Sequence, residues 1–274
     1  MRKKIWHRVW FRLRAEGEIS GLGRVFKPPL LRPFAGFEDT PEESTRTGSF
    51  FLRASRDSAT VSGMSAALVK IVLGYLLGSI SGSLWLGRLR GVDIRTQGSG
   101  NAGGTNAFRT QGAWFGLGVG LIDVGKGAFA AWFGGYGLPD GTPALTVALL
   151  TGAAATAGHV WPLYHGFRGG KGVAVVIGVL LVLWPAALVV LAAVLLLVLT
   201  TTGYVGLGSM LAGVALIPTA IFYAPARDRP VWIVTTVVIA AFILFTHRVN
   251  VQRLRAGTEN RFERARLLAR LFSR

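Results

Sequence analysis

The sequence contains no cysteine and few charged side chains. Without cysteine, the 274-residue chain has no disulfides, no thiolate chemistry and no cysteine-bound metal. Charged residues make up 16% of the chain and hydrophobic residues 51%. Soluble domains carry about 25% charged residues. This shortage of charge excludes an ordinary soluble domain, and much of the chain is expected to lie in lipid.

Acidic residues are especially scarce, with 13 Asp and Glu against 30 Lys and Arg, which gives a formal net charge of +17. Such a basic excess is typical of nucleic-acid-binding proteins. In a membrane protein, however, basic loops that face the cytoplasm and anionic headgroups explain it. We therefore expect membrane lipid as a partner and no nucleic acid.

The chain divides into three parts by composition. Residues 1–63 are charged, include a proline-rich stretch and contain no apolar run of signal-peptide length. They predict a basic, disordered N-terminal extension, or a start codon assigned upstream of Met64; a basic helix lying on the membrane is the alternative. Residues 64–249 form the expected membrane domain. Residues 250–274 predict a basic amphipathic tail that rests on the inner leaflet.

Long apolar runs predict an all-α fold, a polytopic membrane bundle of seven transmembrane helices. The predicted segments are 66–89, 113–136, 144–164, 172–184, 185–202, 204–223 and 231–247. The fourth and fifth come from one run, which we divide at Trp184-Pro185 because proline disfavours helix at the preceding residue. Six spans, with 172–202 as one tilted helix, is the alternative count.

Loop charges predict the orientation of this bundle. The loops after the first and third segments and the C-terminal tail are rich in Arg and Lys, whereas the opposite loops carry few charges. The positive-inside rule therefore puts the C-terminus in the cytoplasm. Seven spans then put the N-terminus outside, which conflicts with the basic residues of the extension.

The first polar motif is a glycine-rich loop at 98–106, followed by Arg109. Glycines permit tight turns whose successive N–H groups bind anions, and a guanidinium suits phosphate. The candidate residues here are Ser99, Gly100, Asn101, Gly103, Thr105, Asn106 and Arg109. A flexible loop between helices is the alternative.

The second motif, Gly169-Gly170-Lys171-Gly172, opens an apolar helix. A cation and free N–H groups at a helix N-terminus are well suited to holding phosphate. No GxxxxGK[ST] pattern passes through Lys171, so nucleotide hydrolysis is not expected. A basic anchor at the cytoplasmic end of a helix is the alternative.

The third motif ends the last segment, where His247 and Asn250 share a helix face and Glu259 follows. Imidazole there is a candidate general base or a donor to phosphate, although a lone interfacial histidine is more often inert. Asp123 and Lys126 form a further candidate pair inside the second segment, either functional or mutually neutralising. Because the three motifs fall on the same predicted side, we expect one shared site.

In this order, the motifs resemble the acyl-phosphate-dependent glycerol-3-phosphate acyltransferases of bacterial membranes. The resemblance covers roughly 66–260 and is carried by GSGNAGGTNAFRTQG (98–112), DVGKG (123–127), GHVWPLYHGFRGGKGVA (158–174) and HRVNVQRLRAGTE (247–259). It implies seven spans in the cytoplasmic membrane and an active site toward the cytoplasm. It further implies acyl phosphate and glycerol 3-phosphate as substrates, lysophosphatidic acid as product, and no metal or cofactor.

The resemblance also assigns residues. Ser99 and Arg109 match functional positions of the first motif, and 169–172 match the family's glycerol-phosphate-binding motif. His247, Asn250 and Glu259 match the third motif. One stretch departs: Gly203-Tyr204-Val205-Gly206-Leu207 stands where relatives read roughly Gly-Tyr-Ser-Ser-Leu. Two hydroxyls near the expected site are therefore missing, and a divergent, weakly active paralogue is an alternative.

The expected mechanism is direct acyl transfer, because the chain lacks cysteine and a Ser-His-Asp set. Arg109 and Lys171 would hold two anionic substrates together, and the base would be His247 or an oxygen of the acyl phosphate. A transporter of organophosphates or other anions is the rival class, since broken helices and intramembrane charges occur there too. A non-catalytic scaffold in lipid synthesis is a third reading.

Overall fold

The structure, a computed structural model, describes residues 41–267. Residues 1–40, most of the expected extension, and 268–274, the end of the basic tail, lie outside the described residues. The chain divides into a unit at Met1–Ser49 and a compact unit at Phe50–Arg274. Regular structure in the described part is entirely helical, which confirms the all-α prediction. The α-helices are α2 (Pro41–Gly78), α3 (Gly82–Leu89), α4 (Gly104–Gln111), α5 (Ala113–Gly135), α6 (Ala144–Val160), α7 (Val173–Leu183), α8 (Ala187–Thr202), α9 (Val205–Tyr223), α10 (Arg229–Thr246) and α11 (Arg248–Arg255). The 3-10 turns are η1 (Ile94–Thr96), η2 (Leu163–His165), η3 (Ala226–Asp228) and η4 (Glu263–Ala265).

Most predicted segments coincide with helices. Four stretches of the described chain are long and apolar enough to cross a membrane: Thr60–Gly78, Ala144–His165, Val205–Tyr223 and Ala226–Thr246. The apolar helices α7 and α8 are shorter. They are separate helices divided at Trp184-Pro185, as predicted, so the alternative of one helix over 172–202 is wrong.

The first predicted segment differs in two ways. Helix α2 begins at Pro41, so residues 41–63, which we expected in a disordered extension, are helical. The missed signal is a proline followed by Glu42 and Glu43, a common start of a helix. In addition, the helix stops at Gly78 and the chain restarts as α3 at Gly82, so 66–89 is not one helix.

The C-terminal tail is helical only as far as Arg255. Gly257 follows with φ +69°, a left-handed conformation that commonly ends helices. Residues 258–267 then run mainly as irregular chain with the single turn η4.

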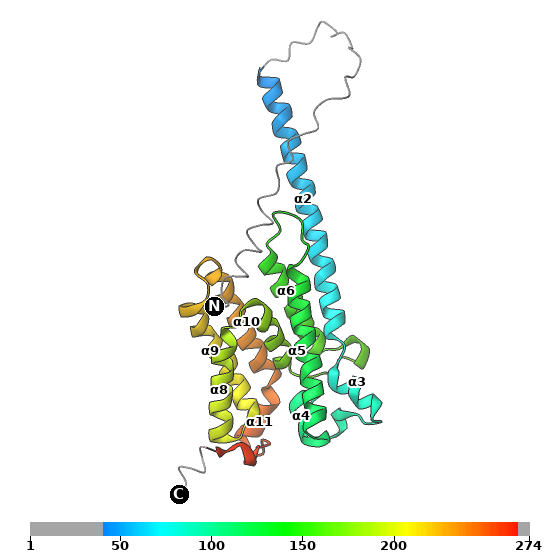
Figure 1. Cartoon of the computed structure of the whole chain (residues 1–274), viewed down its shortest axis with the longest axis vertical. Helices are drawn as coiled ribbons and strands as arrows, with labels where there is room; N and C mark the ends of the chain where they lie inside the picture. The colour runs from blue at the N-terminus through cyan, green and yellow to red at the C-terminus, as the bar shows by residue number, and fades with distance from the viewer. Residues whose placement is uncertain (1–40, 268–274) are drawn as a thin grey trace, which may run out of the picture. The chain divides into compact units, whose positions relative to one another are not determined.

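Close helix crossings hold the compact unit together (Figure 1). Helix α5 contacts α3, α4, α6 and α7, and α9 contacts α8 and α10. Glycines allow these approaches: a β-carbon on Gly127 would overlap the carbonyl oxygen of Val175, and one on Gly178 that of Val124. Small residues at such crossings are typical of membrane helices, which associate by backbone packing.

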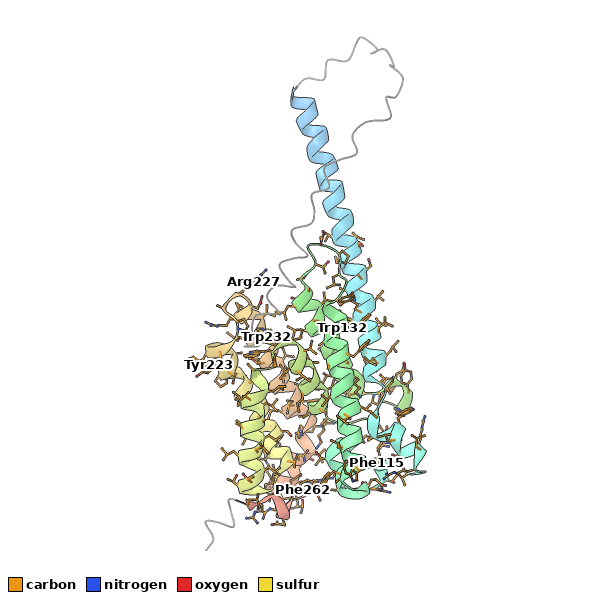
Figure 2. All side chains as sticks on the ribbon, in the orientation of Figure 1. Phe115, Trp132, Tyr223, Arg227, Trp232 and Phe262 are labelled. Atoms are coloured by element: carbon orange, nitrogen blue, oxygen red, sulfur yellow. The ribbon has the colours of Figure 1, made fainter. Side chains whose placement is uncertain are left out.

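Helix α4, helix α11 and the segment after it lie at the same end of the compact unit, the lower end in Figure 1. Figure 2 shows Phe115 and Phe262 at that end, and Tyr223, Arg227 and Trp232 toward the opposite end. The first and third motifs, far apart in the sequence, therefore gather at one end of the bundle.

Candidate active site

A polar cavity of about 240 Å³ brings all three motifs together. The predicted residues that line it are Ser99, Asn101, Gly103, Thr105, Asn106, Arg109, Asp123, Lys171, Gly172, His247, Asn250 and Glu259. Val205 and Gly206 of α9 also line it, and so does His159 of α6. The shared cavity fits the expectation of one site.

A second polar cavity, of about 280 Å³, adjoins the first. Gly100, Gly169 and Gly170 line this one, together with three arginines, Arg168, Arg248 and Arg253. Both cavities are lined by Ser99, Asn101, Lys171 and Asn250. Lys171 and Asn250 therefore stand in the wall between two polar spaces.

Lys171 reaches this wall from the loop before α7. Its Nζ donates to Oδ1 of Asn250, and Nδ2 of Asn250 donates to Oε1 of Glu259 at 2.8 Å. Oε2 of Glu259 is buried and has no hydrogen-bond partner among the described residues. Burial lowers the pKa of Lys171 to about 8; the Glu259 carboxylate acts in the opposite direction, and the arginines Arg253 and Arg109 lower the pKa further.

His247 follows α10 directly and is 3% exposed. Its Nδ1 lies 2.8 Å from the carbonyl oxygen of Ile243. Because a carbonyl only accepts, we assign the proton to Nδ1, which leaves Nε2 with a free lone pair. Burial, followed by the nearby Lys171 cation, lowers the pKa of His247 to about 4. The imidazole is therefore neutral at pH 7, with the lone pair of Nε2 free to accept a hydrogen bond, and the lowered pKa makes it a weaker base than free imidazole.

Arg109, on α4, is half-buried beside the C-terminal segment. Its guanidinium carbon stands 4.2 Å from the ring centroid of Phe262, and Nη2 donates to the carbonyl oxygen of Asn260 at 3.3 Å. Burial lowers the pKa of Arg109 and the Glu259 carboxylate opposes this shift. The group keeps its charge, because arginine is not deprotonated in proteins.

The side-chain amide of Asn106 is hydrogen-bonded to the backbone of the loop and is not left free to bind a ligand. Its Oδ1 accepts from the backbone N–H of Ser99 at 2.9 Å, and its Nδ2 donates to the carbonyl oxygens of Ile94 and Gln97 at 3.1 and 2.9 Å. Gly98 and Gly100 have φ of +55° and +76°, which the tight loop requires. Asn106 thus fixes the loop that carries Ser99.

The Asp123–Lys126 pair explains the break between α2 and α3. Lys126 Nζ lies 3.0 Å from Oδ1 of Asp123 and donates to the carbonyl oxygens of Gly78 and Ile80 at 3.0 and 2.8 Å. Oδ1 of Asp123 accepts from the N–H of Gly82, the first residue of α3, at 3.4 Å. The pair satisfies backbone groups that the broken helix leaves free. Lys126 is the one predicted site residue that lines neither cavity.

No role in the site was assigned to His159 or Phe262 from the sequence. Nδ1 of His159 lies 3.4 Å from Asp123 Oδ1 and 2.9 Å from Lys126 Nζ. Because a buried charge pair needs polar neighbours, the Asp123–Lys126 pair was the sequence signal that could have pointed to a buried polar residue such as His159. The ring of Phe262 packs against the guanidinium of Arg109, and no local sequence pattern indicates a contact between residues so far apart in the chain. The described residues contain no group of three or more His, Asp or Glu side chains arranged to hold a metal ion.

An apolar groove of about 800 Å³ opens beside the polar cavity. Its residues come from α4, α5, α8, α9 and the segment around Phe262, and include Phe108, Trp114, Leu117, Gly120 and Leu199. Gly104, Thr105 and Val205 line both the groove and the 240 Å³ cavity. A polar space lined by Arg109 and Lys171 therefore meets a long apolar space at a shared boundary.

Known proteins match this chain over most of its length. The family model of glycerol-3-phosphate acyltransferases matches residues 68–257. The glycerol-3-phosphate acyltransferase of Trichlorobacter lovleyi is 40% identical over 203 residues, 73% of this chain and 100% of the relative. That of Shouchella clausii is 43% identical over 203 residues, 72% of this chain and 97% of the relative.

Two solved structures also match this chain. A crystal structure of PlsY, an integral membrane glycerol 3-phosphate acyltransferase, in its glycerol 3-phosphate form matches with a TM-score of 0.63 and 34% identity. The match covers 74% of this chain and 98% of that one. The lysophosphatidic acid form matches with a TM-score of 0.62 and 33% identity, over 75% and 98% of the two chains. The matched region contains Arg109, Lys171 and His247 with the helices that carry them, and the chain belongs to the glycerol-3-phosphate acyltransferase family.

Proposed function

We propose that the protein transfers an acyl group from an acyl phosphate to glycerol 3-phosphate, giving lysophosphatidic acid and phosphate, the first step of phospholipid synthesis. The observation that carries the proposal is the junction of the polar cavity, which Arg109 and Lys171 line, with the apolar groove. An acyl phosphate has the same two halves, an anionic head and a long apolar tail. The PlsY forms with glycerol 3-phosphate and lysophosphatidic acid support the acceptor and the product.

The charges around the cavity suit two phosphate-bearing substrates. Arg109 and Lys171 line it as cations. Two carboxylates line it as well: Asp123 is paired with Lys126, and Glu259 accepts a hydrogen bond from Asn250. Cations between two anions offset their repulsion and fix their separation. Such orientation contributes about 7–11 kcal/mol toward lowering a bimolecular barrier.

The chemical step is direct transfer. The glycerol hydroxyl oxygen forms the new ester bond with the acyl carbon, the bond from that carbon to the phosphate oxygen breaks, and phosphate leaves with the electron pair. The hydroxyl proton goes to Nε2 of His247 or to an oxygen of the leaving phosphate. Near-normal turnover of His247→Gln would exclude His247 as an obligatory base, because loss of a general base costs about 10²–10⁴ in rate.

We further propose seven transmembrane helices in the cytoplasmic membrane, with the C-terminus and the cavities toward the cytoplasm. The distribution of loop charges supports this orientation. Because the chain has no cysteine, Asp140→Cys and Arg255→Cys each create a unique thiol. In intact cells, a membrane-impermeant thiol reagent should label the Asp140→Cys protein and spare the Arg255→Cys protein; the opposite pattern would reverse the orientation.

The deciding experiment is acyl transfer by the purified protein with palmitoyl phosphate and glycerol 3-phosphate in lipid. Lysophosphatidic acid should form, and it should vanish in Lys171→Ala. Arg255→Ala is the matched control, because this exposed cation lines neither cavity, and it should keep wild-type activity. No product from folded wild-type protein would refute the proposal and favour a divergent paralogue or a transporter, which a phosphate-ester uptake assay would then separate.

A further inference from the structure

His159 lies near the end of α6 and forms one buried cluster with two ionisable neighbours, Asp123 and Lys126. Asp123 is 1% exposed, His159 2% and Lys126 6%. Nδ1 of His159 is the ring atom that faces Asp123 Oδ1 and Lys126 Nζ, at 3.4 and 2.9 Å. One edge of the imidazole is therefore fixed by the charge pair that also caps α2 and α3.

The opposite edge of the ring faces the second motif. A β-carbon on Gly170 would overlap Nε2 of His159 and come within 2.9 Å of Cε1. The backbone N–H of Gly170 donates to the carbonyl oxygen of His159, and that of Gly169 to Val160, each at 3.1 Å. The backbone of Gly170 thus packs against the imidazole of His159, and the glycine loop is hydrogen-bonded to the last two residues of α6.

Lys171 is the next residue after this contact. Its carbonyl oxygen accepts from Oγ1 of Thr246 at 3.2 Å, and its Nζ reaches Asn250. The loop is therefore held from α6 on one side and from α10 and α11 on the other. Displacing Gly170 would displace the Lys171 cation relative to both polar cavities.

We propose that His159 is a positioning residue, which sets the place of Lys171 by supporting Gly170 on an imidazole that Asp123 and Lys126 hold from behind. The inference rests on the proposed function, in which Lys171 binds substrate phosphate. It gives the buried ion pair a second role beyond capping the helix break. Contact with the imidazole, together with the carbonyl oxygen of Ala102 at 3.0 Å from the same β-carbon position, favours glycine at 170 although the backbone there is not left-handed.

His159→Asn tests the proposal, because the shorter amide keeps a polar group toward Asp123 and removes the ring edge under Gly170. Its KM for glycerol 3-phosphate should rise about tenfold while kcat stays within about threefold of wild type. Gly170→Ala, which drives a methyl group into the ring, should raise the KM similarly. The double variant, in which the methyl fills the space left by the ring, should return to within about threefold of wild type.

Thr151→Val, a buried change earlier in α6 and away from both cavities, is the matched control and should leave the KM unchanged. A purely structural role for His159 predicts lowered thermal stability, an unchanged KM and additive effects in the double variant; that result would overturn the inference. Binding of glycerol 3-phosphate is measured in parallel from ligand-induced thermal stabilisation. Wild-type protein that binds glycerol 3-phosphate without acylating it would refute the proposed function alone, and His159 would then be judged from the dissociation constants.

Discussion

The backbone of Gly206 lies against the side-chain amide of Asn250, so that a β-carbon on Gly206 would stand 2.7 Å from Nδ2. The same amide connects Lys171 to Glu259. Gly206 therefore provides the space in which Asn250 joins the cation to the carboxylate. This contact also gives a physical meaning to the departure at 205–206, where serine hydroxyls were expected from the family resemblance.

Gly206→Ala should disturb this arrangement, because the added methyl forces Asn250 away from at least one of its two partners. Loss of a hydrogen bond to a charged group costs about 1.5–3 kcal/mol, so we expect kcat/KM to fall about tenfold or more. Acyl transfer with palmitoyl phosphate measures the effect. Gly206→Ser makes the same clash and adds a hydroxyl; activity retained in the serine variant alone would mean that the hydroxyl replaces the lost contact.

The pH dependence should follow Lys171. Its pKa is lowered to about 8, so the cation is present below that pH and is lost as the pH rises through 8. We therefore expect kcat/KM for glycerol 3-phosphate to decline above about pH 8. Glu259 raises this pKa, so Glu259→Gln should move the decline to lower pH. A profile that is the same in both proteins would remove Lys171 as the titrating group.

Lys126→Met should destabilise the membrane domain. It would leave the Asp123 carboxylate buried beside the ring of His159 and would strip the carbonyl groups of Gly78 and Ile80 of their donor. Removing one partner of a buried ion pair costs on the order of 3–5 kcal/mol. Thermal unfolding in detergent measures the loss. The variant with Asp123→Asn added should recover part of the stability, since no charge is then left unpaired.

The apolar groove should determine the accepted acyl length. Gly120 lines it, and apart from neighbouring residues of its own helix no described atom lies within 4 Å of an ideal β-carbon at this position. Gly120→Leu should fit sterically, fill part of the groove and shift the preference toward shorter acyl phosphates, by about tenfold in relative kcat/KM. Gly125→Leu is the control: it lies on the same helix with equal free space but outside the groove. An equal shift in both variants would argue against the groove as the acyl site.

Local signals in the sequence predicted most helices but not every break. Pro185 divides α7 from α8 because proline acts on its own chain neighbours. The break at Gly78 is capped by Lys126, which is 48 residues away, and no local pattern reveals that hydrogen bond. Such a break requires knowledge of how the helices pack.

The same distinction applies to the candidate site. The residue types at 98–109, 169–172 and 247–259 indicate phosphate chemistry, and the three stretches line adjoining cavities. Their separate tasks depend on tertiary contacts. Asn106 resembles its neighbours in sequence, yet its amide is used up by the loop backbone. His159 required the positions of Asp123 and Gly170 before its role became visible.

Asp123 and Lys126 lie three residues apart on α5. Their ion pair therefore needs only this helix in order to form and does not depend on the helices that follow it in the chain. A lone charge at the centre of an inserting helix costs about 2.5–3.5 kcal/mol, and a partner one turn away offsets part of that cost. The carbonyl groups of Gly78 and Ile80 belong to chain made earlier still. The insertion machinery thus meets α5 as a self-neutralised segment whose carbonyl partners precede it in the chain, and His159 on α6 joins the pair only afterwards.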